Sequence, residues 1–288
     1  MKQGFVKVAS ATPGIRVADP VYNARAICTQ AKEAAEHGAK IIVFPELCIT
    51  GYTCNDLFLQ NLLLKKAKEA LLTIAEETSR LGALLFVGLP VEKDGRLYNV
   101  AAAVYRGSIL GMIPKKNIPT YAEFYEGRYF TSGEERITNF RLGEYEVPFG
   151  TNLLFCCEEL PELVLGCEIC EDLWVADPPS TSHALAGATV IANLSASNET
   201  VSKDAYRELL VKSTSARLLC GYIYTSAGEG ESTQDLVFGG HNLIAENGTL
   251  LAQSSRFATG ILYTDLDVFK ISSERRRMGT FGKQPTVS

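Results

Sequence analysis

A short run at residues 40–44, with the sequence Lys-Ile-Ile-Val-Phe and four consecutive apolar residues after the lysine, restricts the fold of this chain more than any other segment. His37-Gly38 precedes the run and Pro45 follows it, and glycine and proline commonly end helices and strands. A short β-branched run without alternation is typical of a strand that is buried on both faces. Such a strand requires a sheet with further layers of structure packed on each side.

Strand-like and helix-like segments alternate along the rest of the sequence. Asp19-Pro20 predicts a helix start, because aspartate caps helices and proline favours their first turn. We expect further helices at 56–81 and 204–219, a hairpin at 98–114, and strands at 5–9, 84–89, 153–157, 163–169, 189–194, 222–225, 236–245 and 249–253. This order predicts sheets with helices packed outside them in one domain, residues 1–273, followed by an aperiodic segment at 274–288.

The composition excludes several classes of protein. The 288 residues include 33 acidic and 28 basic side chains, so the net charge is −5, and 46% of the residues are hydrophobic. These values argue against a disordered or fibrous chain, and the acidic balance argues against nucleic acid or an anionic membrane as a partner. The sequence has no apolar stretch of about 18 residues, and its N-terminus is too polar for a signal peptide, so we expect a cytoplasmic protein.

Common catalytic and metal-binding motifs are missing from the sequence. It has no G-x-S-x-G elbow, no phosphate-binding loop of the G-x-x-x-x-G-K-[ST] type and no G-x-G-x-x-G motif after a strand. Cys167 and Cys170 form a C-x-x-C motif, but positions i and i+3 of a strand face opposite sides. The same objection applies to Cys156 beside Cys157. We therefore expect no metal site, and we expect seven of the eight cysteines to be free thiols that act as small core residues.

Three reactive side chains follow apolar strands. Glu46 follows the 40–44 run after Pro45, Lys115 follows the hairpin at 98–114, and Cys170 directly follows the strand at 163–169. Strand ends are where α/β folds place reactive groups. A carboxylate, an ammonium and a thiol together would supply a base, a charge stabiliser and a nucleophile. Each residue alone could equally be a solvated charge or a buried thiol.

The blocks around these residues resemble the nitrilase (carbon–nitrogen hydrolase) superfamily. They read Phe-Pro-Glu-Leu at 44–47, Lys-x-x-Ile-Pro-x-Tyr at 115–121 and Ile-Cys-Glu-Asp-Leu-Trp at 169–174. The resemblance implies an α/β fold, a nitrilase-like four-layer α-β-β-α sandwich that forms homo-oligomers through its outer helices. It also implies a triad of Glu46, Lys115 and Cys170, with Glu126 orienting the lysine, and its spacing selects Lys115 over Lys116.

Further segments resemble the glutaminase domain of glutamine-dependent NAD⁺ synthetases. They are Pro-Thr-Tyr-x-Glu-Phe-Tyr-Glu at 119–126, Asn-Leu-Ser-Ala-Ser at 193–197, Gly-Glu-Gly-Glu-Ser-Thr at 228–233 and Arg-Arg-Arg-Met at 275–278. The resemblance implies hydrolysis of L-glutamine, and it suggests residues that hold this substrate. These candidates are Tyr52, Tyr121, Phe124, Glu171, Ser197 and Lys203. Lysine at 203, where some relatives carry arginine, would contact the substrate carboxylate as a point charge.

The same resemblance implies that the released ammonia serves the ATP-dependent amidation of deamido-NAD⁺ to NAD⁺. The sequence has no Ser-Gly-Gly-x-Asp-Ser pyrophosphate loop, so we expect that the synthetase domain is absent from this chain and that 274–288 is a tail or linker toward it. On this reading the domain holds no cofactor, and ATP and Mg²⁺ act only in the synthetase domain.

Two other functions remain open. The same triad could serve a stand-alone amidase, nitrilase or N-carbamoyl hydrolase, which ammonia release from glutamine but not from simple amides or nitriles would distinguish. Alternatively, the chain could be a catalytically silent nitrilase-like module that serves oligomerisation. An intact set of Glu46, Lys115 and Cys170 argues against such a loss of chemistry.

Overall fold

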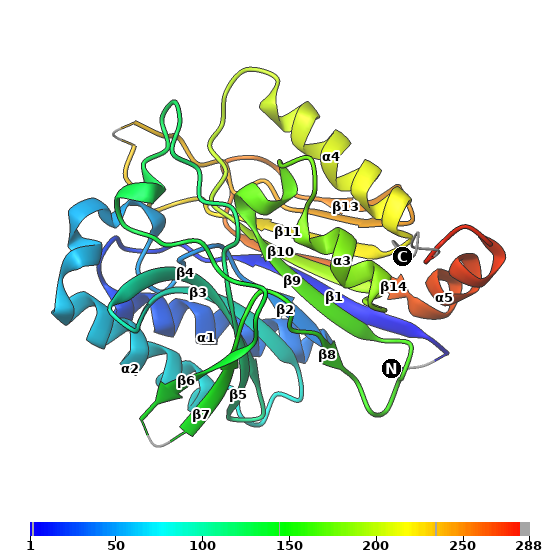
Figure 1. Ribbon diagram of the computed structural model, residues 1–288, viewed down its shortest axis with the longest axis horizontal. Helices are drawn as coiled ribbons and strands as arrows, with labels where there is room; N and C mark the ends of the chain where they lie inside the picture. The colour runs from blue at the N-terminus through cyan, green and yellow to red at the C-terminus, as the bar shows by residue number, and fades with distance from the viewer. Residues whose placement is uncertain (2, 144, 234, 283–288) are drawn as a thin grey trace, which may run out of the picture.

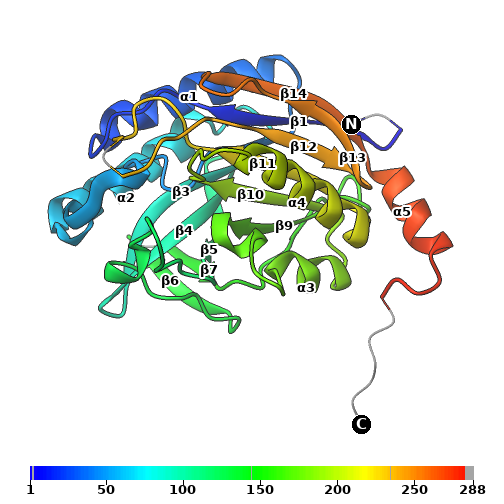
Figure 2. The same cartoon turned by 90° about the horizontal axis from the view of Figure 1, so that it is seen from above.

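Two β-sheets pack face to face in the computed structural model, which describes residues 1, 3–143, 145–233 and 235–282 (Figure 1). Within these residues, eight strands form the larger sheet in the order β14-β1-β2-β3-β4-β5-β7-β6. Six strands form the smaller sheet in the order β13-β12-β11-β10-β9-β8. Figure 2 shows α1 and α2 on the outer side of the larger sheet and α3 and α4 on the outer side of the smaller one.

The elements have the following bounds. The larger sheet contains β1 (Phe5–Thr12), β2 (Ile41–Val43), β3 (Leu84–Lys93), β4 (Arg96–Tyr105), β5 (Ser108–Pro114), β6 (Thr138–Leu142), β7 (Tyr145–Phe149) and β14 (Gly260–Asp267). The smaller sheet contains β8 (Phe155–Cys156), β9 (Val164–Ile169), β10 (Val190–Ser195), β11 (Gly221–Ser226), β12 (Leu243–Glu246) and β13 (Thr249–Gln253). The helices are α1 (Pro20–Glu36), α2 (Asn61–Glu77), α3 (Pro179–Leu185), α4 (Lys203–Leu218) and α5 (Val268–Arg277), with 3₁₀ helices η1 (Tyr52–Leu59), η2 (Glu126–Arg128) and η3 (Cys170–Leu173).

The strand predicted from the apolar run, β2, is an interior strand of the larger sheet. All three residues of β2 are buried, and β2 pairs in parallel with β1 on one side and β3 on the other. The first helix also follows its sequence signals, because the Asp19 side chain accepts the Tyr22 N–H at 3.0 Å and Pro20 opens the helix. These two predictions are confirmed.

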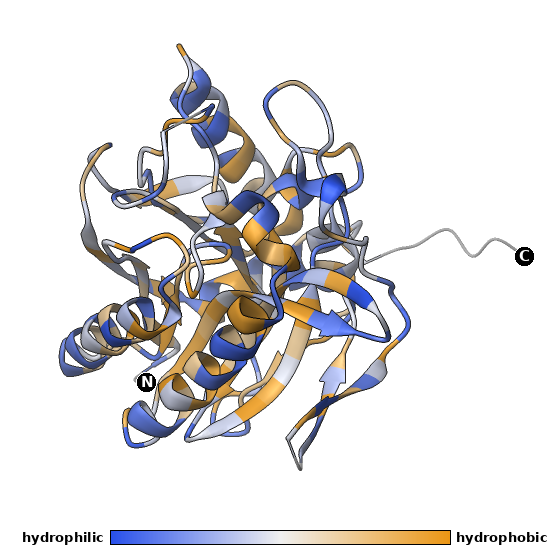
Figure 3. Ribbon diagram, turned by 90° about the vertical axis from the view of Figure 1, so that its left-hand side faces the viewer, coloured by the Kyte–Doolittle hydropathy of each residue, from blue (hydrophilic) through white to orange (hydrophobic). Residues whose placement is uncertain are grey.

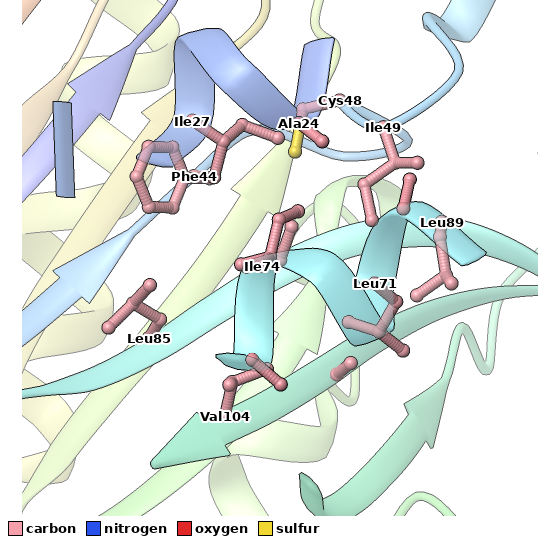
Figure 4. Close-up of a cluster of buried hydrophobic side chains, with 14 of the residues drawn as sticks. Ala24, Ile27, Phe44, Cys48, Ile49, Leu71, Ile74, Leu85, Leu89 and Val104 are labelled. Atoms are coloured by element: carbon pink, nitrogen blue, oxygen red, sulfur yellow. The ribbon is translucent and has the colours of Figure 1, made fainter. Parts of the chain in front are cut away.

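Three apolar layers hold the fold together. Helices α1 and α2 cover the outer face of the larger sheet, where Ile27 and Ile74 meet Phe44 and Leu85 (Figure 4). A second layer lies between the sheets, and α3 and α4 cover the smaller sheet in a third. Figure 3 shows hydrophobic residues along the inner strands and hydrophilic residues on the outer helix faces. The predicted α/β class, with its four-layer α-β-β-α arrangement, is confirmed.

Several predicted element bounds are wrong. The helix predicted at 56–81 is a 3₁₀ helix, η1, and a separate α-helix, α2, because Gln60 between them has extended backbone. The strand predicted at 236–245 is limited to β12, which begins at Leu243. The hairpin of β6 with β7, helix α3 and strand β14 have no counterpart among the sequence predictions.

The cysteines differ in part from the prediction. All eight are free thiols in the structure, and Cys28, Cys48, Cys54, Cys167 and Cys220 are buried as expected. Cys156 is exposed and Cys157 is half-buried, however, so the prediction that both are core residues is wrong. They lie in or directly after the two-residue edge strand β8, which has no neighbour on its other side among the described residues.

Helical structure continues beyond the predicted domain end at 273. Helix α5 extends to Arg277, and the Arg275 guanidinium donates to the carbonyl oxygens of Ala188 at 2.6 Å and Leu219 at 2.9 Å. These bonds attach α5 to the ends of the strands and helices of the smaller sheet. The division of the chain at 273 stays a prediction, and residues 283–288 of the expected tail lie outside the described residues.

Gly88 in β3 lies directly beneath the turn that follows β2. A Cβ atom at this position would lie 2.3 Å from the Leu47 backbone nitrogen and 2.6 Å from the Pro45 carbonyl oxygen. Such overlap with backbone requires the turn to move, so Gly88→Ala is expected to lower the free energy of unfolding by about 3 kcal/mol. Urea denaturation followed by circular dichroism measures this change.

Gly14→Ala is the matched control for this prediction. A Cβ atom there would meet only the Thr259 Cγ2 atom, at 3.9 Å, which is ordinary van der Waals contact. We expect its unfolding free energy to stay within about 0.5 kcal/mol of the wild type. Equal stability of the two variants would contradict the close approach of β3 to the turn.

Candidate active site

The three reactive side chains of the sequence prediction lie where strands end. Glu46 follows β2, Lys115 follows β5 and Cys170 follows β9. Strand β5 runs in the same direction as β2, because β2 and β3 are parallel and β4 is antiparallel to both β3 and β5. The carboxyl ends of β2 and β5 therefore lie on the same side of the larger sheet, where the strands end, and the carboxyl end of β9 in the smaller sheet lies beside them.

Lys115 lies between two carboxylates. Its Nζ atom is 2.7 Å from Glu46 Oε1 and 2.6 Å from Glu126 Oε1. Lys115 and Glu46 are fully buried and Glu126 is 4% exposed, so water screens these contacts little. A single cation between two buried carboxylates leaves the cluster with a net negative charge when all three groups are ionised.

Two polar side chains complete this cluster. Asn99 Nδ2 donates to Glu46 Oε1 at 2.6 Å and lies 3.5 Å from Glu126 Oε2. The Tyr52 hydroxyl donates to Glu126 Oε1 at 2.9 Å. The backbone N–H of Lys115 donates to the backbone carbonyl oxygen of Asn99 at 2.8 Å, and this bond holds β4 beside the end of β5. Each carboxylate is therefore held by more than the lysine alone.

The surroundings move the pKa values of these groups. Burial acts to lower the pKa of Lys115, but the carboxylates of Glu126 and Glu46 outweigh it, and the pKa lies well above its ordinary value. Burial raises the pKa of Glu126 to about 7, although Lys115 and the Tyr52 hydroxyl oppose the rise. Lys115 is therefore charged at neutral pH, and Glu126 takes up a proton more readily than a solvated glutamate does.

Cys170 begins η3 in an uncommon backbone conformation. Its φ angle is +44°, a left-handed value that residues other than glycine rarely adopt, and the side chain is 7% exposed. Burial raises the pKa of its thiol, Glu46 raises it further and Lys115 opposes both. The thiol is therefore neutral until a base removes its proton, and these charges act on it because the four residues are close together.

Asp172 holds the Cys170 turn in place. Its Oδ2 atom accepts the Ile169 N–H at 3.0 Å, across the corner between β9 and η3. Its Oδ1 atom accepts the backbone and side-chain N–H groups of Asn117, both at 2.8 Å. One buried carboxylate thus connects the turn that carries the thiol to the segment that carries Lys115.

A cavity of about 390 Å³ opens beside the thiol. Its lining residues are Pro119, Tyr121, Glu123, Phe124, Glu126, Cys170, Glu171, Trp174, Ser197, Thr200, Val201, Ser202, Lys203 and Tyr206. The Tyr121 hydroxyl donates to Glu171 Oε1 at 2.8 Å at its rim, and burial raises the pKa of Glu171. A cavity of this size suits a small-molecule ligand. Its lining includes both an acidic residue, Glu171, and a basic one, Lys203.

Lys203 brings a positive charge to this cavity. Its Nζ atom lies 5.3 Å from the centre of the Phe124 ring and 5.2 Å from the ring centre of Trp174. The same atom donates a hydrogen bond to Asn198 Oδ1. Burial lowers the pKa of Lys203, while the neighbouring Cys170 raises it. A partly desolvated ammonium between two aromatic rings is well suited to bind a carboxylate.

Behind the cavity wall, Arg207 fixes the backbone and side chain of the 197–199 segment. Its guanidinium is fully buried and donates to Ser197 Oγ at 3.2 Å, the Asn198 carbonyl oxygen at 3.1 Å and Glu199 Oε1 at 2.8 Å. It also contacts His241 Nδ1 at 2.8 Å, and burial lowers the pKa of this histidine to about 4. The buried Arg207 guanidinium thereby fixes the position of the Ser197 hydroxyl in the cavity wall.

The structure brings most of the predicted site residues together. Glu126, Cys170 and five of the six candidate substrate residues line the cavity, namely Tyr121, Phe124, Glu171, Ser197 and Lys203. Glu46 and Lys115 lie behind its wall. Tyr52 is not in this lining; it contacts Glu126 from the other side, where it lines a smaller cavity of about 50 Å³.

Sequence reasoning missed four residues that support the site, which are Asn99, Asp172, Trp174 and Arg207. Asp172 and Trp174 stand within the block at 169–174, so that motif was a signal for both. Asn99 and Arg207 lie within a strand and a helix, and no local pattern distinguishes them.

Metal ligands and membrane spans were also sought within the described residues. No group of three or more histidine, cysteine, aspartate or glutamate side chains there is arranged to hold a metal ion. None of the helices described is both long and apolar enough to cross a membrane.

Comparison with known sequences gives a consistent family. The profile described as carbon-nitrogen hydrolase matches residues 7–276. A glutamine-dependent NAD(+) synthetase from Mycobacterium tuberculosis is 46% identical over 282 residues, which are 97% of this chain and 42% of that relative. Its counterpart from Aquifex aeolicus is 33% identical over 250 residues, covering 85% of this chain and 40% of the relative. The chain thus spans about two fifths of the length of these curated relatives.

Solved structures give the same result. A glutamine-dependent NAD(+) synthetase from Cytophaga hutchinsonii has a TM-score of 0.82 at 30% identity, covering 91% of this chain and 43% of that one. An amidase of the nitrilase superfamily from Nesterenkonia has a TM-score of 0.73 at 20% identity, covering 96% of each chain. The second likeness concerns the fold alone.

Proposed function

The chain belongs to the carbon–nitrogen hydrolase family, and on that premise we propose that it hydrolyses the side-chain amide of L-glutamine through a thioester on Cys170. The geometry around Glu46 carries this proposal. Glu46 Oε1 accepts hydrogen bonds from Asn99 and Lys115, whereas its buried Oε2 atom has no hydrogen-bond partner among the described residues. A buried carboxylate oxygen without a donor, close to a neutral thiol, is suited to act as the general base.

In the first step Glu46 takes the thiol proton of Cys170, and the sulfur attacks the amide carbon of glutamine. The developing oxyanion needs donors that are already in place. Lys115 has three N–H donors and gives two of them to Glu46 and Glu126, so the third is available for the oxyanion. The Glu171 backbone N–H, directly after the nucleophile, is the second proposed donor. One such donor is typically worth about 3 kcal/mol.

The second step breaks the carbon–nitrogen bond. Glu46 returns its proton to the departing nitrogen, so ammonia leaves and a thioester on Cys170 remains. Glu46 then takes a proton from water, the resulting hydroxide attacks the thioester carbon, and the sulfur leaves with that proton as the thiol. The products are glutamate and ammonia, and Cys170 and Glu46 return to their starting states.

The cavity offers opposite charges for the two ends of the glutamine backbone. We propose that Lys203, with Ser197, holds the α-carboxylate and that Glu171, with Tyr121, holds the α-ammonium group. Phe124 would pack against the methylene groups of the substrate. Burial weakens the hydration of Lys203 and Glu171, which strengthens their interaction with a charged ligand.

We propose that the ammonia serves an ATP-dependent synthetase domain that converts deamido-NAD⁺ to NAD⁺. The support for this proposal is the likeness to glutamine-dependent NAD(+) synthetases over 97% of the chain. ATP and Mg²⁺ would then act in that other domain and not beside Cys170. We also propose that the domain works in the cytoplasm as a homo-oligomer.

Ammonia release from L-glutamine, acetamide and propionitrile tests the substrate. We expect kcat/KM for glutamine to exceed the other two values by at least about 10³-fold, because only glutamine uses both charged ends of the cavity. We also expect Lys203→Met to raise KM for glutamine about 30-fold and to leave activity toward acetamide unchanged, because acetamide has no carboxylate.

Lys212→Met on the same helix is the control, since Lys212 is half-buried, pairs with Glu208 and does not line the cavity. It should leave both KM values as they are in the wild type. Faster hydrolysis of acetamide or propionitrile than of glutamine would refute a glutaminase and favour a stand-alone amidase or nitrilase.

A further inference from the structure

We infer that Glu231 is a positioning residue for this reaction, acting on Lys115 through Tyr52 and Glu126. The inference rests on the proposed function and extends it to the Gly-Glu-Gly-Glu-Ser-Thr segment at 228–233, which contributes nothing to the triad. Glu231 is 179 residues from Tyr52 in the sequence, yet its carboxylate contacts the backbone of that residue.

Glu231 caps η1 from outside the helix. Its Oε1 atom accepts the Tyr52 N–H at 2.6 Å, and its Oε2 atom accepts the Thr53 N–H at 3.0 Å and the Thr53 hydroxyl at 2.6 Å. The residue at the cap position itself, Gly51, has no side chain that could do this. A carboxylate at the first N–H groups of a helical turn satisfies donors that the turn itself leaves free.

The backbone around Glu231 is fixed as well. A Cβ atom on Gly230 would lie 1.9 Å from the Ile15 carbonyl oxygen, and the φ angle of Gly230 is +98°. The Ile15 N–H donates to the Glu229 carbonyl oxygen at 3.1 Å, and the Ser232 N–H donates to Thr53 Oγ1 at 2.9 Å. The segment therefore holds the Glu231 carboxylate in one place, against η1.

From η1 the chain of contacts leads to the catalytic lysine. The Tyr52 hydroxyl donates to Glu126 Oε1 at 2.9 Å, and the same oxygen accepts Lys115 Nζ at 2.6 Å. Burial, followed by the charges of Glu126 and Glu46, holds the pKa of Tyr52 well above its ordinary value, so the phenol stays a donor. Lys115 can stabilise an oxyanion only if its third N–H points into the cavity, and small displacements of such a group are costly.

Glu231→Gln tests the inference, because glutamine has the same shape but no charge and one oxygen fewer. We expect kcat for glutamine to fall about tenfold while KM changes less than about twofold, since the contacts with bound glutamine are untouched. The acid limb of the kcat/KM profile should also move to higher pH. The reason is that Glu126, which faces Lys115, Glu46, Tyr52, Cys170 and Glu171, loses a donor to its charged form.

A double-mutant cycle with Tyr52→Phe shows whether the effect passes through the hydroxyl. In the Tyr52→Phe background, Glu231→Gln should lower kcat by less than about twofold further, because the link to Glu126 is already broken. Glu229→Gln is the matched control, since this side chain is exposed two residues away, and it should behave as the wild type. Additive losses in the cycle, or an unchanged pH profile, would show that Glu231 only stabilises the fold.

Two further arms keep the result decisive. If Glu231→Gln does not fold, Thr53→Ala removes one of the three donors to the carboxylate and should lower kcat about threefold with KM unchanged. The rate of Cys170 alkylation by iodoacetamide, measured on the peptide that contains Cys170 by mass spectrometry, needs no glutamine turnover. It should move to higher pH in Glu231→Gln, because a displaced Lys115 lowers the pKa of the thiol less. Suppose that the pH profile of alkylation shifts between the wild type and Glu231→Gln, but the wild type releases no ammonia from glutamine. That result would refute the proposed function, while the effect of Glu231 on the Lys115 and Cys170 pair would stand.

Discussion

Cys170→Ala is expected to lower the rate of ammonia release from L-glutamine by about 10⁴-fold or more, because the covalent route then has no nucleophile. The Cys170 residue is 7% exposed, lines the cavity and has a left-handed backbone conformation at the start of η3. Alanine removes only the sulfur, so circular dichroism and the melting temperature should change little. Residual turnover within about tenfold of the wild type would contradict a thioester mechanism.

The same variant identifies the nucleophile without turnover. A glutamine-shaped electrophile, 6-diazo-5-oxo-L-norleucine, should add once to the wild-type chain and not at all to Cys170→Ala, as measured by intact mass. Cys156→Ser is the matched control, because Cys156 is the exposed thiol and contacts none of the cavity residues. It should form the adduct at the wild-type rate. An adduct that persists in Cys170→Ala would assign the modified thiol to another cysteine.

The reactive residues could be predicted because each one follows an apolar strand that is visible in a short window of sequence. Strand ends alone did not select Glu46, Lys115 and Cys170, because each could equally be a solvated charge or a buried thiol; the resemblance of the three blocks around them to one family made them a triad. The spacing of the family motif selected Lys115 over Lys116, and the two lysines differ in the structure: Lys115 directly follows β5 and is buried, while Lys116 pairs with the exposed Glu135.

The contacts of the supporting residues could not be predicted, even where a motif contains the residue, because these contacts join positions far apart in the sequence. Asn99 acts on Glu46 across 53 residues, Asp172 on Asn117 across 55, and Glu231 on Tyr52 across 179. The helix predicted at 56–81 was wrong for a different reason. Its apolar spacing suits one helix, but Gln60 is extended, and the buried Phe58 of η1 packs in a cluster separate from the main core. Tertiary packing overrode local periodicity there.

Lys115→Met is expected to lower both activity and stability. Activity should fall by about 10³-fold, because the oxyanion loses a charged donor in a buried site. Stability should fall by about 3–5 kcal/mol at pH 8, because Glu46 and Glu126 would stay buried without their cation. The melting temperature from pH 5 to pH 8 and urea denaturation at both ends of that range measure the second effect.

The stability loss in Lys115→Met should depend on pH in one direction. Burial already raises the pKa of Glu126 from 4.5 to about 7 while Lys115 opposes the rise, so removing the lysine raises it further. A carboxyl whose pKa is raised by folding contributes its stability below the unfolded value and loses it as pH rises through the folded value. The variant should therefore be closest to the wild type at pH 5 and furthest from it at pH 8. Lys116→Met, which removes the neighbouring lysine and its exposed partner contact, should match the wild type within about 0.5 kcal/mol at both pH values. A loss in Lys115→Met that is equal at pH 5 and pH 8 would mean that lost packing, and not two unpaired carboxylates, destabilises the variant.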